Sequence, residues 1–569
     1  MKEFNIAEKK QPEVFALATL RNFFRKRKQD SRLQVCESII SDLKLKCEPL
    51  DLCNWLDAEK AAQDAAQEEK PKAEKVSKKL PVDTMTGSFR AKAELMPVIE
   101  TDKAVIVTSA QNNTANTPVF KQLKALAAHL NAELIVLPVY YNRTAFDVDA
   151  ESETESFNAD VKPYLLESDS WLYERGQVRL AAEAAVLPTA KLPINAAEQL
   201  NRGELFTVVG SPKQQFKCIP TLLKTRTPKA WTTGTCTAFN YKRGRAGSEA
   251  ETQHIFGGTL FTRDDSGAVN STNIRQGDDG TIYLYLAELG EQIVIDAKGE
   301  NVTAGSPAQM GKLYGQPATK LGDLHCEMSD PVQWQKALDY VADIQPLFVA
   351  VDDILHFATR GHHQRNDSKH LYATRDERVT NDLLQVITQL NELAEIAPVY
   401  VTESNHNSSL DIWLSDTSVK IDYDAHNAKI YHLIKWLVMD TLDDGIKDKN
   451  ALQIALENAD LTSLPAINDR VVFGRMDVPK YGYKYDFSQH GHKGQSGSAG
   501  NPKQLAKLNL FLVSGHTHSP CILGTQFVTG VTASLNQGYN RGGASGWDHA
   551  HVMEHPNGEC QLINTNPQV

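Results

Sequence analysis

The sequence predicts an α/β protein with three parts: a short helical N-terminal segment, a smaller α/β domain and a larger C-terminal α/β domain. Two observations predict this class. Short apolar runs rich in β-branched residues alternate with stretches whose apolar residues recur every three or four positions, as strands alternate with helices. Polar, histidine-rich motifs follow several of these runs, at the positions where a parallel sheet would gather them.

Length and composition set the outer limits. A chain of 569 residues allows two to four domains, and 41% hydrophobic with 23% charged residues is typical of a soluble protein. We expect no integral membrane segment, because no apolar run approaches the ~20 residues of a membrane helix. Eight cysteines without a Cys-x-x-Cys pair indicate a reducing cytoplasm. The net charge of −11 excludes a protein basic all over, but not local binding of nucleic acid.

Residues 1–57 are predicted to form short helices that include the basic run 25–28. This part is either a small DNA-binding or docking module, or a helical appendage with a solvated basic face. Residues 58–95 are mostly Ala, Glu, Gln and Lys, with few large apolar side chains. Such a composition predicts a charged linker.

Residues 96–315 are predicted to form the smaller, accessory α/β domain. Residues 104–108 and 134–139 favour strands, and 118–130 favours a helix between them. The loop after the first strand lacks a glycine-rich phosphate fingerprint, so no nucleotide site is expected there. Two polar and basic stretches, 232–236 and 240–245, are followed by His254; they form either a phosphate-contacting patch or a solvated loop. Further strands are expected within 271–315.

Histidine usage changes at the start of the C-terminal domain, residues 316–569. Only His129 and His254 precede it, so 15 of the 17 histidines lie at or beyond His325. Histidine is the commonest metal ligand and the side chain best suited to proton transfer near neutral pH. The skew therefore predicts that the chemistry lies in this domain.

Candidate metal ligands follow four predicted strands of this domain. The motifs are 322–325 after a short strand-like stretch, 352–356 after the strand 347–351, 403–407 after the strand 398–401, and 515–518 after the apolar run 508–513. His490-Gly491-His492 lies in a glycine-rich loop that we cannot attach to a strand. A helix is expected over 379–396, and Asp330 is expected to cap a helix that begins at Pro331. Two divalent ions about 3.5–4 Å apart can clamp a phosphodiester, and a carboxylate between them can bridge.

The order Asp-x-His, Asp, Asn-His, His, Gly-His-x-His over residues 320–520 resembles the calcineurin-like metallophosphoesterase superfamily. This resemblance implies a β-sandwich flanked by helices. Asp353-Ile-Leu-His356 resembles the second motif of the SbcD-type DNA repair nucleases. Asp352 and Ser404 depart from the pattern, because glycine usually stands at both positions.

A second resemblance covers roughly residues 95–565. Its segments are 108–112, 188–190, 210–214, 232–234 with 240–241, 360–363, 490–494, 515–520 and 539–542. They resemble the pre-early A-one nuclease family of T-five-like bacteriophages. This family resemblance implies a phage early protein that degrades host DNA and aids DNA transfer, in the host cytoplasm.

The resemblance also implies the roles of the site residues. One metal would be held by Asp323, His325, Asp353 and His518, and the second by Asp353, Asn405, His490 and His516. The catalytic residues would be His406, which faces the phosphate, and His356, which orients either His406 or the phosphate. His492 is the alternative to His490 as ligand and otherwise contacts substrate. Further substrate-binding candidates, each of which is as readily a solvated side chain, are Arg360, His362, His363, Arg365 and Arg541.

These expectations define a metal-dependent DNase with two divalent ions, Mn²⁺ first and Fe²⁺, Zn²⁺ or Mg²⁺ as alternatives. A phosphatase or nucleotide phosphodiesterase of the same fold is the nearest alternative. A DNA-transfer scaffold with a minor catalytic role is the other. The expected partners are DNA, further copies of the chain and other phage early proteins.

Overall fold

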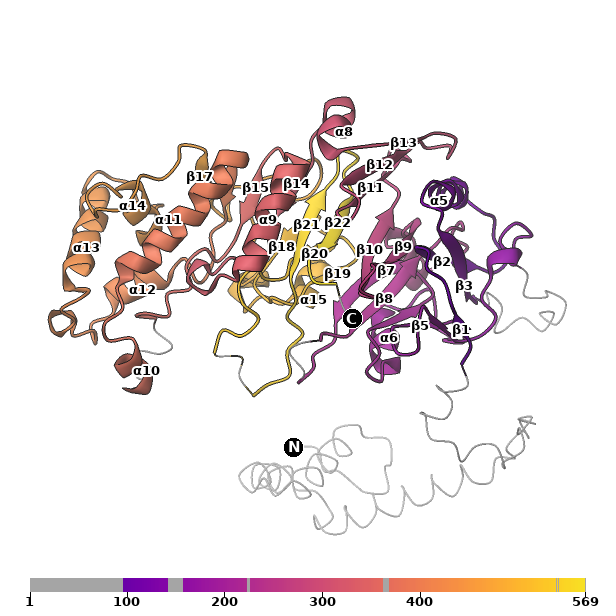
Figure 1. The fold of residues 1–569 in the computed structure, drawn as a ribbon, viewed down its shortest axis with the longest axis horizontal. Coiled ribbons are helices and arrows are strands. Elements are labelled where there is room, and N and C mark those ends of the chain that lie inside the picture. The colour runs from indigo at the N-terminus through magenta and orange to yellow at the C-terminus, as the bar shows by residue number, and fades with distance from the viewer. Residues whose placement is uncertain are drawn as a thin grey trace, which may run out of the picture. The chain divides into compact units, whose positions relative to one another are not determined.

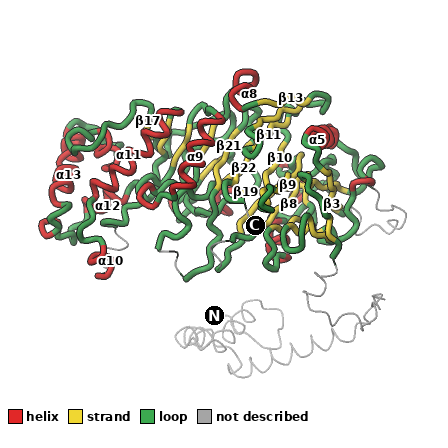
Figure 2. The backbone as a smooth tube through the Cα atoms, in the orientation of Figure 1, coloured by secondary structure: helices red, strands yellow, loops and turns green. Residues whose placement is uncertain are grey.

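A computed structural model gives the fold for residues 96–141, 157–222, 226–361, 368–538, 540 and 542–567. The predictions for residues 1–95 lie outside these described residues. Residues 95–569 form one compact unit, so the boundary predicted between 315 and 316 falls inside it. The unit combines several sheets with helices (Figures 1 and 2), which confirms the α/β class. Within the described residues, no helix is both long enough and apolar enough to cross a membrane.

A six-stranded sheet forms the centre of the C-terminal half. Its order is β17 (Val471–Phe473), β16 (Val399–Val401), β15 (Val349–Val351), β14 (Ala318–Lys320), β21 (Ala550–Glu554) and β22 (Cys560–Asn564). The strands from β17 to β14 run parallel, and β21 and β22 are antiparallel. The helices that connect parallel strands cover one face (Figure 1): α9 (Pro331–Ile344) and α11 (Val379–Ile396).

Alternation along β15 shows how this sheet divides two cores. Val349 and Val351 pack with the helices, whereas Ala350 packs among residues of a second sheet on the other face. Successive side chains of a strand point to opposite faces, so an all-apolar strand is what a sheet covered on both sides requires. The predicted helix 379–396 is confirmed as α11, and Asp330 caps α9 by accepting from the Val332 and Gln333 amides.

The second sheet has nine strands and draws on both halves of the chain. Its order is β1 (Val98–Ile99), β4 (Ser170–Leu172), β5 (Val178–Ala181), β6 (Phe206–Val209), β8 (Lys229–Gly234), β7 (Ser211–Cys218), β19 (Cys521–Leu523), β20 (Gln526–Val528) and β18 (Leu512–Ser514). The joint is the antiparallel pairing of β7 with β19. The accessory strands thus share one sheet with β18, the strand before the last histidine motif, with β19 and β20 between them.

Two smaller sheets complete the accessory region. The first has the order β10 (Val269–Arg275), β9 (Gly257–Arg263), β2 (Val105–Gln111) and β3 (Glu133–Val139), and the second is β11 (Ile282–Leu286), β12 (Glu291–Ile295) and β13 (Val302–Gly305). Helix α5 (Pro118–His129) lies where a helix was predicted over 118–130, and it buries Phe120, Leu123 and Leu126. The other helices are α6 (Ile194–Leu200), α7 (Arg245–Thr252), α8 (Pro307–Tyr314), α10 (Ser368–Ala373), α12 (Ser409–Ser415), α13 (Ala428–Asp443), α14 (Ala451–Glu457) and α15 (Pro502–Leu505).

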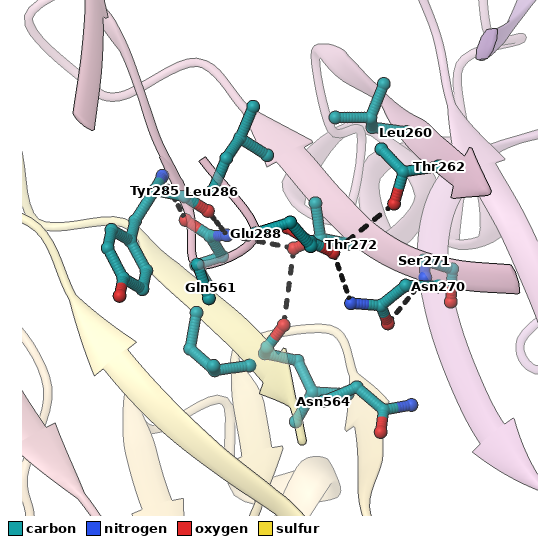
Figure 3. A pocket seen from close by; sticks show the side chains of 13 residues that line it. Leu260, Thr262, Asn270, Ser271, Thr272, Tyr285, Leu286, Glu288, Gln561 and Asn564 are labelled. Carbon is teal, nitrogen blue, oxygen red and sulfur yellow. Dashed lines mark hydrogen bonds between the residues drawn. The ribbon is translucent and has the colours of Figure 1, made fainter. Parts of the chain in front are cut away.

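A small polar cavity marks the seam between these sheets and β22 (Figure 3). The Gln561 side chain donates to the Tyr285 carbonyl at 2.7 Å and to the Thr272 hydroxyl at 3.0 Å, and accepts from the Tyr285 amide at 2.9 Å. The cavity holds about 20 Å³, which is room for about one water molecule. It is therefore a joint between strands rather than a ligand site.

One strand prediction was wrong in its bounds. The apolar run 508–513 was expected to be a buried strand, but β18 covers only Leu512–Ser514. Leu508 belongs to a 3₁₀ turn, and Asn509 adopts a left-handed backbone with φ of 51°, which breaks an extended chain. Leu510 is 52% exposed.

A buried ion pair links the accessory region to the loop that precedes β21. The Lys229 ammonium lies 2.7 Å from the Asp548 carboxylate, and both side chains are fully buried. Removing one partner of such a pair strands the other charge away from water. We expect Lys229→Met to lower the free energy of unfolding by about 3–5 kcal/mol in urea titrations. Combining Lys229→Met with Asp548→Asn should restore most of the lost free energy of unfolding. A loss under about 1 kcal/mol for Lys229→Met alone would contradict a stabilising role of the pair.

Candidate metal centre

The predicted motifs meet at one edge of the six-stranded sheet. Because β14, β15 and β16 are parallel neighbours, their carboxyl ends lie together, and each leads directly into one motif. The fourth motif comes from β18 of the nine-stranded sheet. The Gly530 carbonyl accepts from the Asp323 amide, and Gly530 lies just beyond β20, which pairs with β18. The site therefore lies where the two sheets meet.

The first group of side chains is Asp323, His325, Asp353 and His518. Their candidate ligand atoms lie within 4.8 Å of one another, and all four residues are buried. The His518 Nε2 atom is 3.2 Å from the Asp323 Oδ2 atom and 3.0 Å from the His325 Nε2 atom. The His325 Nε2 atom is 3.7 Å from the Asp353 Oδ2 atom. This is the set predicted for one metal.

The second group shares Asp353 with the first and adds His490 and His516. The His490 Nε2 atom lies 3.2 Å from the Asp353 Oδ2 atom and 3.0 Å from the Asn405 Oδ1 atom. The four residues are those predicted for the second metal. Asp353 is thus the one carboxylate common to these two groups.

The loop that could not be attached to a strand is held by β18. The Asp486 carbonyl accepts from the Val513 amide, and four residues later the His490 carbonyl accepts from the Gly515 amide at 2.8 Å. The segment therefore runs alongside β18 and delivers His490 to the same edge. The ring centre of His492 lies 5.3 Å from that of His490, and His492 belongs to none of the described metal-type groups.

The backbone at the site is unusual at the ligand positions. Four residues that are not glycine have left-handed φ angles: 41° at His325, 43° at Asp353, 74° at His516 and 54° at His518. Such conformations cost about 1–3 kcal/mol each and cluster at functional sites. Gly515 serves another need, because a Cβ there would lie 2.1 Å from the Asp323 Oδ1 atom.

His406 and His356 lie beside the first group. Their rings are stacked with centres 5.6 Å apart, and the His406 ring centre is 4.6 Å from that of His325. The Nδ1 atom of His406 lies 3.3 Å from the His356 carbonyl, and the His406 amide donates to the Asp353 Oδ1 atom at 3.3 Å. His325, His356 and His406 form a further group with close ligand atoms, since the two Nδ1 atoms of His325 and His356 are 3.1 Å apart.

The histidines of the site differ in their pKa. Burial lowers the pKa of His325 well below its usual value and lowers that of His356 to about 3. Burial opposes protonation of His490 too, but the carboxylates of Asp353 and Asp352 outweigh it and raise the pKa of His490 well above its usual value. His490 thus holds a proton between two carboxylates. A divalent ion would replace that proton, so its binding should weaken as the pH falls.

Two buried charged residues behind the site were not predicted as part of it. The Asp352 Oδ2 atom lies 3.2 Å from the His490 Nδ1 atom and 2.8 Å from the Lys320 ammonium, and all three side chains are fully buried. A carboxylate that accepts from the far nitrogen of a histidine fixes which nitrogen remains free for a metal. The signal available in the sequence was Asp352 itself, which stands where glycine is usual.

Replacing Asp352 by asparagine should weaken binding at the second metal group by about 10- to 100-fold, because the support of His490 is lost. Calorimetric titration with Mn²⁺ would measure it, with thermal unfolding to verify the fold. Asp411→Asn, a half-buried carboxylate on α12, is the control and should leave both affinities unchanged. Equal affinities in the two variants would contradict the role given to Asp352.

Glu327 was also missed. Its carboxylate accepts from the amides of His356 and Phe357 at 2.7 and 2.9 Å, and it therefore fixes the turn that presents His356. Burial raises the pKa of Glu327 to about 7.

The predicted substrate-binding residues are only partly described. Arg360 donates to the Asp424 carboxylate at 2.5 Å and to the carbonyls of Thr359 and Thr374. These bonds hold Arg360 in the wall of a cavity of about 410 Å³, which Trp413 and Tyr423 also line. His362, His363, Arg365 and Arg541 lie outside the described residues.

Fold and site together define a mixed α/β protein with buried histidine and aspartate clusters that could hold metal ions. The chain is similar to a bacteriophage protein, Protein A1 of Escherichia phage T5, at 29% identity over 578 residues and 98% of each chain. No family model matches the sequence. No solved structure matches it either.

Proposed function

We propose that this protein is a metal-dependent DNase of the calcineurin-like metallophosphoesterase type, in the branch of the SbcD-type nucleases. The observation that carries the proposal is the pair of histidine–carboxylate groups that share Asp353. The parallel strands that deliver the motifs, packed between helices and a second sheet, agree with a β-sandwich flanked by helices.

The residues fit divalent ions. The Asp323 Oδ1 atom is buried and has no hydrogen-bond partner among the described residues, although a buried carboxylate oxygen normally has one. Lys320 lies against Asp352, which leaves the Asp323 and Asp353 carboxylates to be balanced by protonated histidine or by metal. Mixed oxygen and nitrogen ligands suit Mn²⁺, Fe²⁺ or Zn²⁺ better than Ca²⁺. Mg²⁺ is the remaining alternative.

When bound, two such ions supply charge stabilisation for a phosphodiester and make water a better nucleophile near neutral pH. The protein orients the groups around them. Asp353 would help to hold both ions. Asp352 would keep the Nδ1 atom of His490 protonated, so that the Nε2 atom of His490 is free for a metal.

His406 and His356 would handle the proton and the substrate. The Nδ1 atom of His406 is engaged by the His356 carbonyl, which leaves its Nε2 atom for the phosphate. His406 is half-buried and thus reachable by substrate. From there it would stabilise developing charge and protonate the leaving oxygen. His356 would orient His406, and His492 would contact substrate beside the second group.

The likeness to a bacteriophage protein supports a phage role. We propose an early protein that acts in the host-cell cytoplasm, degrades host DNA and aids phage DNA transfer, as a homo-oligomer or with other early phage proteins. A phosphatase or nucleotide phosphodiesterase would use the same metal groups.

One assay separates these functions. Plasmid, linear duplex and single-stranded DNA would be incubated with the protein and Mn²⁺, next to a chromogenic phosphate ester. We expect DNA cleavage that EDTA stops, with little ester turnover. Ester turnover without DNA cleavage would overturn the nuclease in favour of the phosphatase, and neither activity would favour a DNA-transfer scaffold.

A further inference from the structure

We propose that a loop of the accessory region, residues 239–245, binds unpaired DNA; none of its residues belongs to the metal groups. The inference rests on the proposed function, because it names DNA as the ligand. The loop joins β8 to α7, and we call it the basic–aromatic loop. The sequence left residues 232–236 and 240–245 as either a phosphate-contacting patch or a solvated loop. The structure buries 232–236, which therefore form neither. For the basic–aromatic loop it adds three observations that favour a contact.

The first observation is its free positive charge. Lys242, Arg243 and Arg245 are all exposed, and within the described part of the chain their side chains form no ion pair or hydrogen bond. Some other exposed cations of the described residues are paired: Arg475, for example, is bonded to both Asp448 and Asp477. Three unpaired cations in four positions on a chain of net charge −11 form a local anion-binding surface.

The second observation is an exposed aromatic ring with firm backing. Phe239 is 49% exposed and stacks on Tyr241, with ring centres 6.3 Å apart and planes 7° from parallel. Tyr241 is buried, and its hydroxyl lies 2.8 Å from the Nδ1 atom of His254. Tyr141 also packs edge-on against Tyr241, with ring centres 5.8 Å apart, which further fixes the ring behind Phe239.

The third observation is that the loop is anchored rather than loose. The Asn240 side chain donates to the Asn112 carbonyl at 3.0 Å and accepts from the Gln111 side chain at 3.2 Å. The backbone of α7 comes so close that a Cβ on Gly247 would lie 2.0 Å from the Lys242 carbonyl. A surface held in place beforehand loses less conformational entropy when a ligand binds.

Cations beside an exposed ring fit a strand whose bases are free to stack. Single-strand binding surfaces combine basic side chains along the backbone with aromatic rings under the bases. A DNA duplex could contact the cations but could not stack on Phe239, because the bases of a duplex are already stacked on one another. We therefore assign an unpaired stretch of DNA to this loop, with duplex-backbone binding as an outcome of the test.

The test measures binding of a fluorescent single-stranded 20-mer and of its duplex by anisotropy, over a range of salt concentrations, with the full chain in EDTA. The charge variant is Lys242→Ser, Arg243→Ser and Arg245→Ser together. The matched control removes three exposed lysines elsewhere, by Lys298→Ser, Lys312→Ser and Lys429→Ser. For the charge variant we expect at least about tenfold weaker binding, and a salt slope smaller by about 2, from about 0.7 per phosphate contact.

Phe239→Ala should weaken single-strand binding roughly 5- to 150-fold and leave duplex binding nearly unchanged, whereas Phe239→Trp should retain the affinity. A charge variant that behaves like the control would overturn the proposal. Equal losses for single strand and duplex in Phe239→Ala would replace it by duplex-backbone binding. Because EDTA prevents hydrolysis, this assay measures DNA binding independently of nuclease activity. If the loop bound DNA but the protein had no nuclease activity, the proposed function would be wrong and the inference about the loop would stand.

Discussion

Replacing Asp353 by alanine is expected to remove both metal ions and to abolish DNA hydrolysis. Asp353 is the only described side chain that belongs to both predicted metal sets, at 3.7 Å from the His325 Nε2 atom and 3.2 Å from the His490 Nε2 atom. Metal ions supply several kcal/mol of charge stabilisation. At about 1.4 kcal/mol per tenfold, we expect activity to fall by about a thousandfold or more. Elemental analysis of the purified variant measures the metal content.

Single-ion losses provide the matched comparison. His516 belongs to the second group and His518 to the first, so His516→Ala and His518→Ala should each weaken one ion and spare the other. If Asp353→Ala kept two ions per chain, the shared carboxylate would be wrong. If His516→Ala and His518→Ala affected the same ion, the division into two groups would be wrong.

Replacing His406 by alanine should slow DNA cleavage by about 10²- to 10⁴-fold while both metals still bind, because general acid catalysis contributes a factor of that size. The His406 amide, not its side chain, contacts Asp353, so the metal groups should survive the change. Single-turnover cleavage with saturating Mn²⁺ measures the rate, and elemental analysis measures the metals.

His432→Ala is the matched control, because this histidine is exposed on α13 and far along the chain from every motif. It should leave the rate unchanged. His406→Ala with full activity would refute the proton-donor role. His406→Ala with metal loss would instead make His406 a ligand, as the close group of His325, His356 and His406 would allow.

Local patterns in the sequence predict those elements whose apolar residues form a short continuous run or recur at a regular spacing. The strands β15 and β16 appear where their apolar runs predict them, because the sheet is covered on both faces. The helix α11 appears where its periodicity predicts it. The motif order places the ligand candidates because the ends of parallel strands share an edge. The pairing of β7 with β19 was not predictable in this way, because it joins residues about 300 positions apart and leaves no local signal.

The pairing of Lys320 with Asp352 behind the site could not be predicted for a related reason. Lys320 follows a buried strand residue and would be read as exposed, yet it lies fully buried because Asp352 neutralises it. A pairing across 32 positions has no periodicity of its own. The apolar run before the last motif was predicted to be buried but is partly exposed, because Asn509 turns the backbone and leaves Leu510 in solvent.

Anomalous diffraction from a crystal of the full chain grown with Mn²⁺ tests the central claim most directly. We expect two peaks on either side of Asp353, one among Asp323, His325 and His518, and the other among Asn405, His490 and His516. A single peak among His325, His356 and His406, or no peak at either group, would contradict the two-metal site.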